Sequence, residues 1–573
     1  MKKAPSLLAL ILIFAPGCSP DVATRAVAQA KSEATLAQHS EEFTPRVEEV
    51  VEGVHVAIGY GLANSILIEG TDGVIIVDTM ESMEAGRKVR AAFDKVTQKP
   101  VKAIIYTHNH ADHIFGAKAL AGDSEPEVYS HASTNHYINR IVNILRPAIF
   151  KRSMRQFGPL LPEGGVENCG IGPHLDLDQD SEPGLLRPTK TFDGENMKTT
   201  IAGVEIELVF APGETPDQIF VWLPQKKVLL PGDNIYKSFP NLYAIRGTAY
   251  RDVMDWARSL DKMRSLKPEV LIPSHTGPVV GQVEVYSMLT NYRDAIQYVH
   301  DQTIRGMNKG LTPDELVEAV RLPERLATLP YLQEFYGTVE WSVRSIFSGY
   351  LGWFSGDAAN LSPVTGTARS EHFAKLAGSP EALAAAAEAA LSAGDTRWAV
   401  ELARELARLE GQREVAAKIL EDGFRTLAEQ SRSANGRNYY LTQALEWSGE
   451  LEIGKQNIHN APDDLFASMP IENFMQAMAV NLRAERTLAL NKYVAVTFTD
   501  LDTTYVINVR HGVAEIQKMA PDKIPLRVTT TSFTWKQLLT GRESLPKLLL
   551  TGDLKIYGTE LELAQFLLLF KPE

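Results

Sequence analysis

Four side chains of the kind that bind metal stand within six residues of this chain, directly after an apolar run. The run at 103–106 reads Ala-Ile-Ile-Tyr and predicts a buried strand, so the four side chains fall on the loop after it. They are His108, His110, Asp112 and His113. Imidazole and carboxylate groups together suit Zn²⁺ and similar divalent ions. His108 and His110, two apart on near-extended backbone, can hold one ion, which leaves Asp112 and His113 for a second. An ordinary polar surface loop is the alternative.

The order His-x-His-x-Asp-His after a strand resembles the metal motif of the metallo-β-lactamase superfamily. That resemblance implies an α/β fold, an αββα sandwich with its metals at one edge of the sheets. It does not name a substrate, because function depends on the residues of the site and not on the fold. The rest of the chain has to narrow the function.

Length and charge limit the possibilities. A chain of 573 residues is too long for one core and indicates about three or four domains. The formal net charge of −13 supplies no basic surface, so no nucleic-acid partner is expected. An anionic substrate would need local positive charge from metal ions and a few arginines. Cys169 is one of only two cysteines, so no disulfide framework is expected either.

The first 18 residues have the pattern of an export signal. Lys2 and Lys3 precede an apolar stretch at 7–14 that is too short to span a bilayer. Ala-Pro-Gly before Cys18 resembles a bacterial lipoprotein cleavage box that is imperfect at its first two places. Lipidation of Cys18, which would tether the protein to the outer membrane, and simple cleavage into the periplasm remain two alternatives. Residues 19–43 are polar and alanine-rich and are expected to be a linker.

Three more candidate ligands follow apolar or β-rich runs, in the chain order that the superfamily shows. Asp233 and His275 each end a buried run, and Glu214 stands in a Pro-Gly-Glu-Thr turn. Most of the superfamily has a histidine where Glu214 stands, and a carboxylate oxygen can replace imidazole on Zn²⁺. A glutamate at this place is characteristic of the alkylsulfatase branch, which this chain therefore resembles. That branch usually has a glutamate, not an aspartate, at the position of Asp233.

The resemblance implies two zinc ions per chain and a ligand set for each. His108, His110 and Glu214 would hold one ion. Asp112, His113 and His275 would hold the other, with Asp233 and a hydroxide between the two ions. Asp78 ends a further predicted strand and resembles the aspartate that this fold places beneath its metal loop. Its expected role is to support a ligand, and the alternative is to cap the helix that begins near Glu81.

Residues 241–247, Asn-Leu-Tyr-Ala-Ile-Arg-Gly, resemble an alkylsulfatase segment whose Asn and Arg hold the sulfate. The resemblance gives this role to Asn241 and Arg246, and a guanidinium suits an oxyanion because it donates two parallel hydrogen bonds. The alternative for Arg246 is a structural pair with Asp252 or another carboxylate. Tyr350 lies in a Tyr-Leu-Gly-Trp-Phe segment of the same branch, and either contacts the anion or belongs to a buried aromatic belt.

The domain organisation also follows the resemblance. Residues 44–298 are expected to form the catalytic domain, in which 146–190, rich in Gly, Pro and Asp, is predicted to be a long loop over the active site. Residues 299–450 have helical patterns and resemble the alkylsulfatase dimerisation region, which implies a homodimer. Residues 464–573 resemble an α+β sterol-carrier-like domain, a type that encloses apolar chains.

The resemblance implies a dinuclear zinc alkylsulfatase that hydrolyses an alkyl sulfate ester to an alcohol and inorganic sulfate. The metals would lower the pKa of a bridging water to about 7 and polarise the ester. Asp112, Asn241 and Arg246 are the candidate catalytic residues. One alternative is a dinuclear hydrolase of another ester or amide, such as a lactam or phosphoester. The other is a lipid-binding lipoprotein with a structural metal site.

Overall fold

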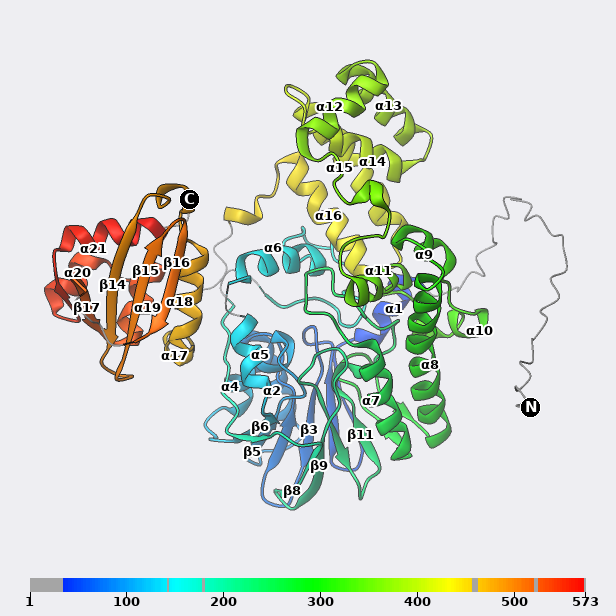
Figure 1. The fold of residues 1–573 in the computed structure, drawn as a ribbon. Coiled ribbons are helices and arrows are strands. Elements are labelled where there is room, and N and C mark those ends of the chain that lie inside the picture. Colours follow the sequence, from blue (N-terminus) through cyan, green and yellow to red (C-terminus); the bar gives the residue numbers. More distant parts are fainter. Residues whose placement is uncertain (1–34, 142–143, 178–180, 456–461, 520–523, 571–573) are drawn as a thin grey trace, which may run out of the picture.

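A computed structural model describes residues 35–141, 144–177, 181–455, 462–519 and 524–570 (Figure 1). The expected export signal and Cys18 lie outside these residues. Within them, no helix has both the length and the apolar character needed to cross a bilayer.

The end of the expected linker is folded. Residues Leu36–His39 form helix α1 and Ser40–Phe43 form a 3₁₀ turn, η1. The His39 ring stacks on Phe335 with 4.3 Å between ring centroids, and its Nε2 lies 2.9 Å from the Gly170 carbonyl oxygen. The linker prediction is therefore wrong from residue 35 onward, because sequence composition did not reveal these long-range contacts.

Two sheets lie at the centre of the catalytic domain (Figure 1). The first contains β1 (Arg46–Val51), β2 (Val54–Ile58), β3 (Ser65–Glu69), β4 (Val74–Val77), β5 (Val101–Ile105), β6 (Glu127–His131) and β7 (Lys190–Phe192), in that order across the sheet. Pairing is antiparallel from β1 to β4 and parallel from β4 to β7. The second contains β8 (Asn196–Ile201), β9 (Val204–Phe210), β10 (Ile219–Leu223), β11 (Val228–Leu230), β12 (Val270–Leu271) and β13 (Val279–Val280), also in that order. There only β11 and β12 pair in parallel.

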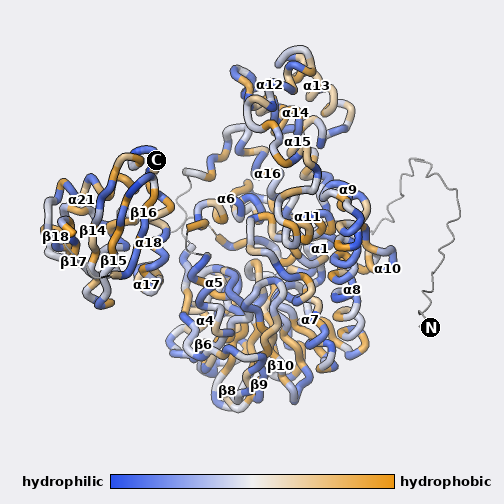
Figure 2. Tube along the Cα trace, viewed as in Figure 1, coloured by the Kyte–Doolittle hydropathy of each residue, from blue (hydrophilic) through white to orange (hydrophobic). Residues whose placement is uncertain are grey.

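Side chains alternate between the two faces of each sheet. Ile66 and Ile68 of β3 pack between the sheets, whereas Leu67 packs against the outer helices. In β10, Val221 faces the first sheet, while Phe220 faces helices on the far side. Both faces are covered, which is why these strands are continuous apolar runs in the sequence and form the hydrophobic centre in Figure 2.

Helices cover both outer faces, so the predicted αββα sandwich is confirmed. On the first sheet lie α2 (Met83–Phe93), α3 (Ala111–Ile114), α4 (Ala117–Ala121) and α5 (Thr134–Ile141). On the second lie α7 (Val253–Ser265) and α8 (Gln282–Met307). A 3₁₀ turn, η2 (Gly232–Asn234), follows β11. Strands β4 and β5 are parallel, as are β11 and β12, so the loops after each pair meet at one edge of the sandwich.

The expected loop at 146–190 begins with a helix, α6 (Arg146–Phe157). It has a proline in its first turn and ends at Gly158, whose φ of 69° is left-handed. Arg152 on α6 donates to the Ile245 carbonyl at 2.6 Å, and Arg155 makes two bonds, 2.7 and 2.9 Å, to Glu446. The loop prediction is wrong here because most of this helix's partners lie more than 90 residues away.

The helical region contains α9 (Pro313–Ala319), α10 (Glu324–Ala327), η3 (Pro330–Leu332), α11 (Val339–Leu351), η4 (Ala358–Asn360), α12 (Gly366–Ala377), α13 (Pro380–Ser392), α14 (Thr396–Leu406), α15 (Arg413–Gln430), α16 (Ala434–Ser448) and η5 (Ile453–Lys455). Leu383, Leu402 and Leu420 are among the residues that form the core of its outer part. The expected boundary after residue 298 falls inside α8, and Val343 of α11 still packs into the core over the second sheet. The two regions therefore share one core.

The carboxy-terminal domain combines α17 (Asp463–Ser468), α18 (Ile471–Val480), η6 (Ala484–Arg486), β14 (Asn491–Phe498), β15 (Thr503–Arg510), β16 (Val513–Lys518), β17 (Leu526–Thr530), α19 (Ser532–Thr540), α20 (Leu545–Thr551), β18 (Leu554–Tyr557), α21 (Glu560–Leu567) and η7 (Leu568–Phe570). Its sheet has the order β16-β15-β14-β17-β18. Phe498, Trp535 and Phe566 fill the space between sheet and helices. A cavity of about 400 Å³ in this domain has a mixed lining, with apolar side chains such as Met469, Ile471 and Leu501 beside charged ones such as Lys518.

Candidate metal centre

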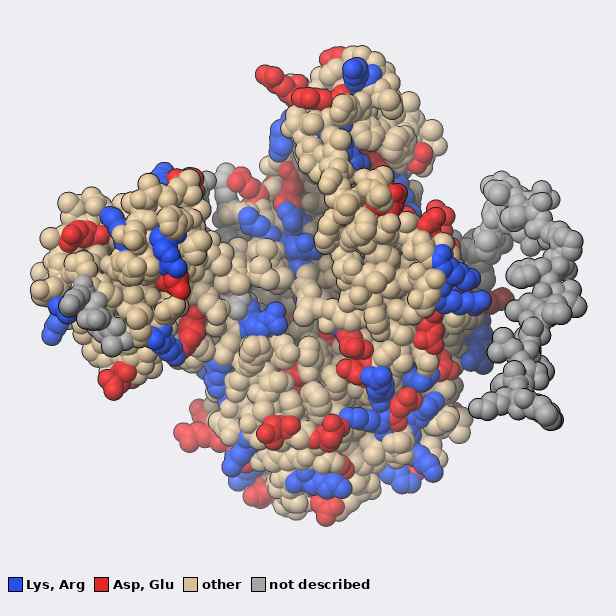
Figure 3. All heavy atoms as spheres, viewed as in Figure 1, with Lys and Arg blue, Asp and Glu red and all other residues tan. Residues whose placement is uncertain are grey.

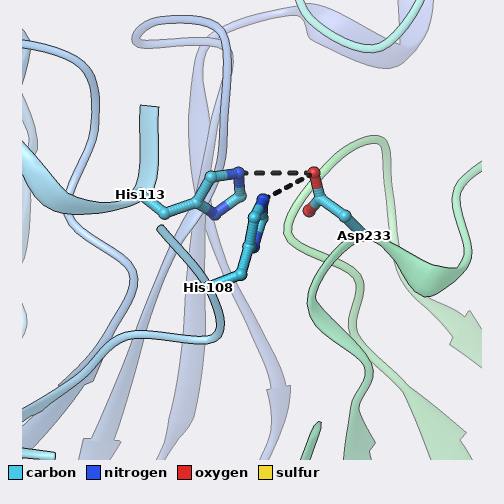
Figure 4. Close-up of side chains that lie close together, drawn as sticks. All are labelled: His108, His113 and Asp233. Atoms are coloured by element: carbon cyan, nitrogen blue, oxygen red, sulfur yellow. Dashed lines mark ion pairs between the residues drawn. The ribbon is translucent and has the colours of Figure 1, made fainter. Parts of the chain in front are cut away.

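The metal-type side chains predicted from the sequence converge at the shared edge of the two sheets. One oxygen, Oδ2 of Asp233, lies 3.1 Å from His275 Nε2, 3.4 Å from His113 Nε2 and 3.6 Å from His108 Nε2. Figure 4 shows the rings of His108 and His113, both from the half of the sandwich that contains β5, pointing at this carboxylate, which comes from the other half. Asp233 is therefore the centre of the cluster, the place that the sequence predicted for a bridging ligand.

The other ligand-type groups lie on either side of Asp233. On one side, Asp112 Oδ2 is 3.4 Å from His113 Nε2 and 3.5 Å from His275 Nε2. On the other side, one ligand atom each from His110, Glu214 and Asp233 lie within 4.8 Å of one another. His108 Nε2 and His110 Nδ1 are 2.9 Å apart.

The spacing and the chemistry of these groups fit bound divalent metal. Two ligand atoms on a tetrahedral zinc ion are about 3.3 Å apart, since each bond is about 2.0–2.1 Å long, and the distances above are close to this value. His113 Nε2 and Asp233 Oδ1 are buried without a hydrogen-bond partner, a costly state that a metal ion would relieve. Burial lowers the pKa of His108 to about 3, so this ring is neutral as a ligand must be.

Three of the histidines are oriented in the same way. Each directs Nδ1–H to a protein oxygen and thereby presents Nε2 to Asp233. The acceptors are the Thr107 hydroxyl for His108 at 3.0 Å, Asp78 for His113 at 2.8 Å and the Leu62 carbonyl for His275 at 2.9 Å.

Asp78 supports the metal loop. Its Oδ2 accepts from His113, from the Thr107 hydroxyl at 2.9 Å and from the Ser274 hydroxyl at 2.7 Å, and Oδ1 accepts the Thr107 N–H at 2.9 Å. The cap of α2 is instead Ser82, whose side chain accepts the Ala85 N–H. Asp78 therefore contacts a candidate ligand, as the supporting role requires, and the alternative of a helix cap is wrong.

Asp78→Asn is expected to lower zinc affinity by about 10–100-fold, because the amide nitrogen would face groups that need an acceptor. Asparagine tolerates the φ of 59° at this position, so the change acts through charge and hydrogen bonds. Chelator competition measures the affinity. Ser82→Ala is the control. It should lower the free energy of unfolding by about 1 kcal/mol and leave zinc affinity unchanged. Equal zinc affinity in Asp78→Asn and the unaltered protein would contradict the role.

The two predicted sulfate-binding residues border the cluster. Arg246 Nη2 lies 2.9 Å from His110 Nε2, and among the described residues this arginine makes no salt bridge with a carboxylate. The alternative partner, Asp252, caps α7 by accepting two N–H groups, so it does not hold Arg246. The Asn241 side chain is 0% exposed, and both of its amide atoms lack a partner. Arg246 thus contacts the cluster directly, and Asn241 is joined to it through its backbone, which is bonded to two partners of Glu214, Tyr236 and Arg251.

Sequence reasoning missed several residues that hold this site together. Arg251 Nη1 lies 2.9 Å from Glu214 Oε1, and the Tyr236 hydroxyl donates to Glu214 Oε2 at 3.3 Å. Glu81 accepts the Leu62 N–H, and burial raises the pKa of its carboxyl to about 7. Arg251 stands five residues after Arg246, and this was the one signal in the sequence that pointed to it.

Tyr350 is not brought into the site. It is 51% exposed on α11, and its hydroxyl is 2.8 Å from His300 Nε2. In the described part of the chain, no hydrogen bond or ring contact joins Tyr350 to any of the seven candidate metal ligands. The predicted contact of Tyr350 with the anion and its alternative, a buried belt, both disagree with this position.

Three family models match the chain in succession. The metallo-beta-lactamase superfamily model matches residues 58–275, the alkyl sulfatase dimerisation model matches 312–450, and the alkyl sulfatase C-terminal model matches 459–572. Together they cover all three parts of the described fold.

Known proteins are similar over almost the whole chain. A linear primary-alkylsulfatase of a Pseudomonas species is 37% identical over 87% of this chain and 97% of its own length. An alkyl/aryl-sulfatase of Saccharomyces cerevisiae is 29% identical over 91% of this chain and 82% of its own. The solved structure of a stereoselective inverting sec-alkylsulfatase from Pseudomonas sp. superposes with a TM-score of 0.85 and 25% identity, covering 94% of this chain and 86% of that one.

Proposed function

The chain belongs to the alkylsulfatases of the metallo-β-lactamase superfamily, and from that premise we propose that it cleaves alkyl sulfate esters with two zinc ions bound at this centre. The products are an alcohol and inorganic sulfate. His108, His110 and Glu214 are proposed for one ion, and Asp112, His113 and His275 for the other. Asp233 lies between the two sets.

One observation supports the choice of substrate: an arginine contacts the cluster of candidate metal ligands without a carboxylate partner of its own among the described residues. Arg246 has no carboxylate partner among the described residues and reaches within 2.9 Å of His110. The Asn241 amide is fully buried with a donor and an acceptor unused, and the Asn241 backbone is bonded to Tyr236 and Arg251, which both contact Glu214. A sulfate ester supplies oxygens for both residues. Because the net charge is −13, an anionic substrate needs positive charge close to the site. The face in Figure 3 has basic and acidic side chains interspersed.

The protein's own groups divide the work as follows. Arg246 and Asn241 hold the sulfate oxygens and orient the ester bond toward the cluster. Asp112 Oδ2 lies 3.4 Å from His113 Nε2 and 3.5 Å from His275 Nε2, and this carboxylate is proposed as an acceptor for the attacking water. Bound zinc supplies Lewis acidity and makes that water acidic enough to act near neutral pH.

The test is release of sulfate from a medium-chain primary alkyl sulfate by the zinc-loaded protein. Ion chromatography of the released sulfate measures turnover, and elemental analysis of the same sample counts the metal. Turnover with two zinc ions per chain is the expected result. Two zinc ions without sulfate release, but with cleavage of a lactam or phosphoester, would replace the proposal with the other-hydrolase alternative. Unfolding on metal removal, with no turnover of any ester beforehand, would favour a lipid-binding protein with a structural metal.

We also propose that two copies of this chain associate through the helical region. Between α11 and α12 the apolar side chains of Leu351, Trp353, Leu361 and Val364 are 58%, 74%, 59% and 53% exposed. A cluster of this kind is typical of an interaction surface. The match to a dimerisation model over 312–450 supports this placement.

Trp353→Asp is expected to convert a dimer to a monomer, because it places a charge in a surface that association would bury. Light scattering after size-exclusion chromatography gives the mass. Leu550→Asp is the matched control: Leu550 is 90% exposed on the carboxy-terminal domain, and the dimer should persist. A monomeric unaltered protein would refute the dimer.

We propose that the protein is exported, because its first 18 residues have the pattern of an export signal. Cys18 is either lipidated, which tethers the protein to the outer membrane, or removed with a cleaved signal, which releases it into the periplasm. Mass spectrometry of the mature amino terminus distinguishes the two.

A further inference from the structure

Arg251 is the most completely buried cation near the metal centre. Its Nη1 lies 2.9 Å from Glu214 Oε1, and both side chains are 1% exposed. The pair is shielded from water, so neither charge is stabilised by solvent.

The position that Arg251 neutralises is the one at which this chain departs from most of the superfamily. A glutamate at 214 brings a negative charge where a histidine would be neutral. The site already contains the carboxylates of Asp78, Asp112 and Asp233, each of them buried. A further buried carboxylate is unfavourable unless a cation pairs with it. We propose that Arg251 is a positioning residue that supplies this counter-charge and so makes a glutamate usable as a metal ligand.

The same arginine connects Glu214, the proposed metal ligand, to Asn241, a proposed sulfate-binding residue. Its Nη1 also donates to the Asn241 carbonyl. Tyr236 makes a parallel connection, because its hydroxyl donates to Glu214 Oε2 at 3.3 Å and accepts the Asn241 N–H at 2.8 Å. Both backbone polar groups of Asn241 are therefore held by the two side chains that hold Glu214. Arg251 thus fixes the backbone of Asn241 relative to the metal ligand, and the link to sulfate binding rests on the proposed function of Asn241.

A merely structural salt bridge would behave differently. If Arg251 only stabilised the fold, its loss would lower the free energy of unfolding and leave zinc affinity unchanged with either residue at 214. If it is the counter-charge of a ligand, its loss matters with glutamate at 214 and ceases to matter with histidine there. The residue at 214 thus separates the two roles.

The experiment is a double-mutant cycle of Arg251→Met and Glu214→His in the full-length protein. Zinc affinity by chelator competition and zinc per chain by elemental analysis are the readouts, with no sulfate ester present. Arg251→Met alone is expected to weaken one of the two zinc sites by about 100-fold. In the Glu214→His background, Arg251→Met should change affinity by less than about threefold or restore it. Equal losses in both backgrounds would overturn the proposal.

Two additions keep the result interpretable. Arg251→Lys retains the charge but not the fork, and should stay within about 10-fold of the unaltered affinity; a loss as large as that of Arg251→Met would contradict the counter-charge role. If Arg251→Met does not fold, Arg251→Gln, which is also neutral but keeps a polar side chain, gives the same comparison in the two backgrounds. Because the readouts need no substrate, failure of the unaltered protein to release sulfate would reject the proposed function and leave this result standing.

Discussion

Asp233→Ala is expected to lower kcat/KM for an alkyl sulfate by at least about 10³-fold, which corresponds to about 4 kcal/mol of transition-state stabilisation. The carboxylate Oδ2 lies within 3.6 Å of the Nε2 atoms of three histidines, so no other side chain occupies so central a place. Without it, the zinc content should fall below two per chain. Sulfate release and elemental analysis on the same sample measure both effects.

Asp233→Glu is the matched control. It restores the residue that alkylsulfatases usually have at this position and keeps the charge. We expect two zinc ions per chain and activity within about 10-fold of the unaltered protein, because only the reach of the carboxylate changes. An Asp233→Ala protein that binds two zinc ions and hydrolyses the ester at the original rate would contradict the central role of this residue.

Arg246→Ala is the second large effect, with an expected loss of about 10²–10³-fold in kcat/KM, the range for removal of one oxyanion donor. The zinc content should stay at two, because Arg246 touches His110 through Nη2 but is not itself a ligand. Steady-state kinetics with an alkyl sulfate, together with elemental analysis, tests both statements.

Two variants show what the guanidinium contributes. Arg246→Lys keeps the charge without the planar fork, so we expect an intermediate loss. Asp252→Ala removes the cap of α7 and should cost about 1 kcal/mol of folding stability with no change in kinetics. If Asp252→Ala reduced kcat/KM as strongly as Arg246→Ala, the structural alternative for Arg246 would regain support.

The sequence allowed the strand ends to be predicted well. Buried strands in a two-sided sandwich are uninterrupted apolar runs, and the loops after β5, β11 and β12 carry the predicted ligand-type residues. The order of these residues along the chain could therefore be compared with that of the metal ligands in the metallo-β-lactamase superfamily. Their convergence on Asp233 follows from parallel pairing, which brings strand ends to one edge.

What could not be predicted depends on contacts between distant parts of the chain. Nothing local shows that Arg251 pairs with Glu214, since each residue alone is compatible with an exposed loop. Helix α6 has a short, mixed pattern and is stabilised by partners such as Glu446. The predicted end of the catalytic domain, residue 298, falls inside α8. Composition does not show where a core ends, because that depends on how the helices pack.

The hydrogen bonds of α6 join segments that are synthesised at different times. The metal-type side chains have all been synthesised once His275 leaves the ribosome. The support of the Arg246 loop arrives later, because Arg152 and Arg155 of α6 join that loop to Glu446 of α16. At about 5–20 residues per second, roughly 10–35 s of synthesis separate the two events. During that interval the candidate ligands are all present in the chain, while the helices that complete the shared core and Glu446, which anchors α6, are still being added.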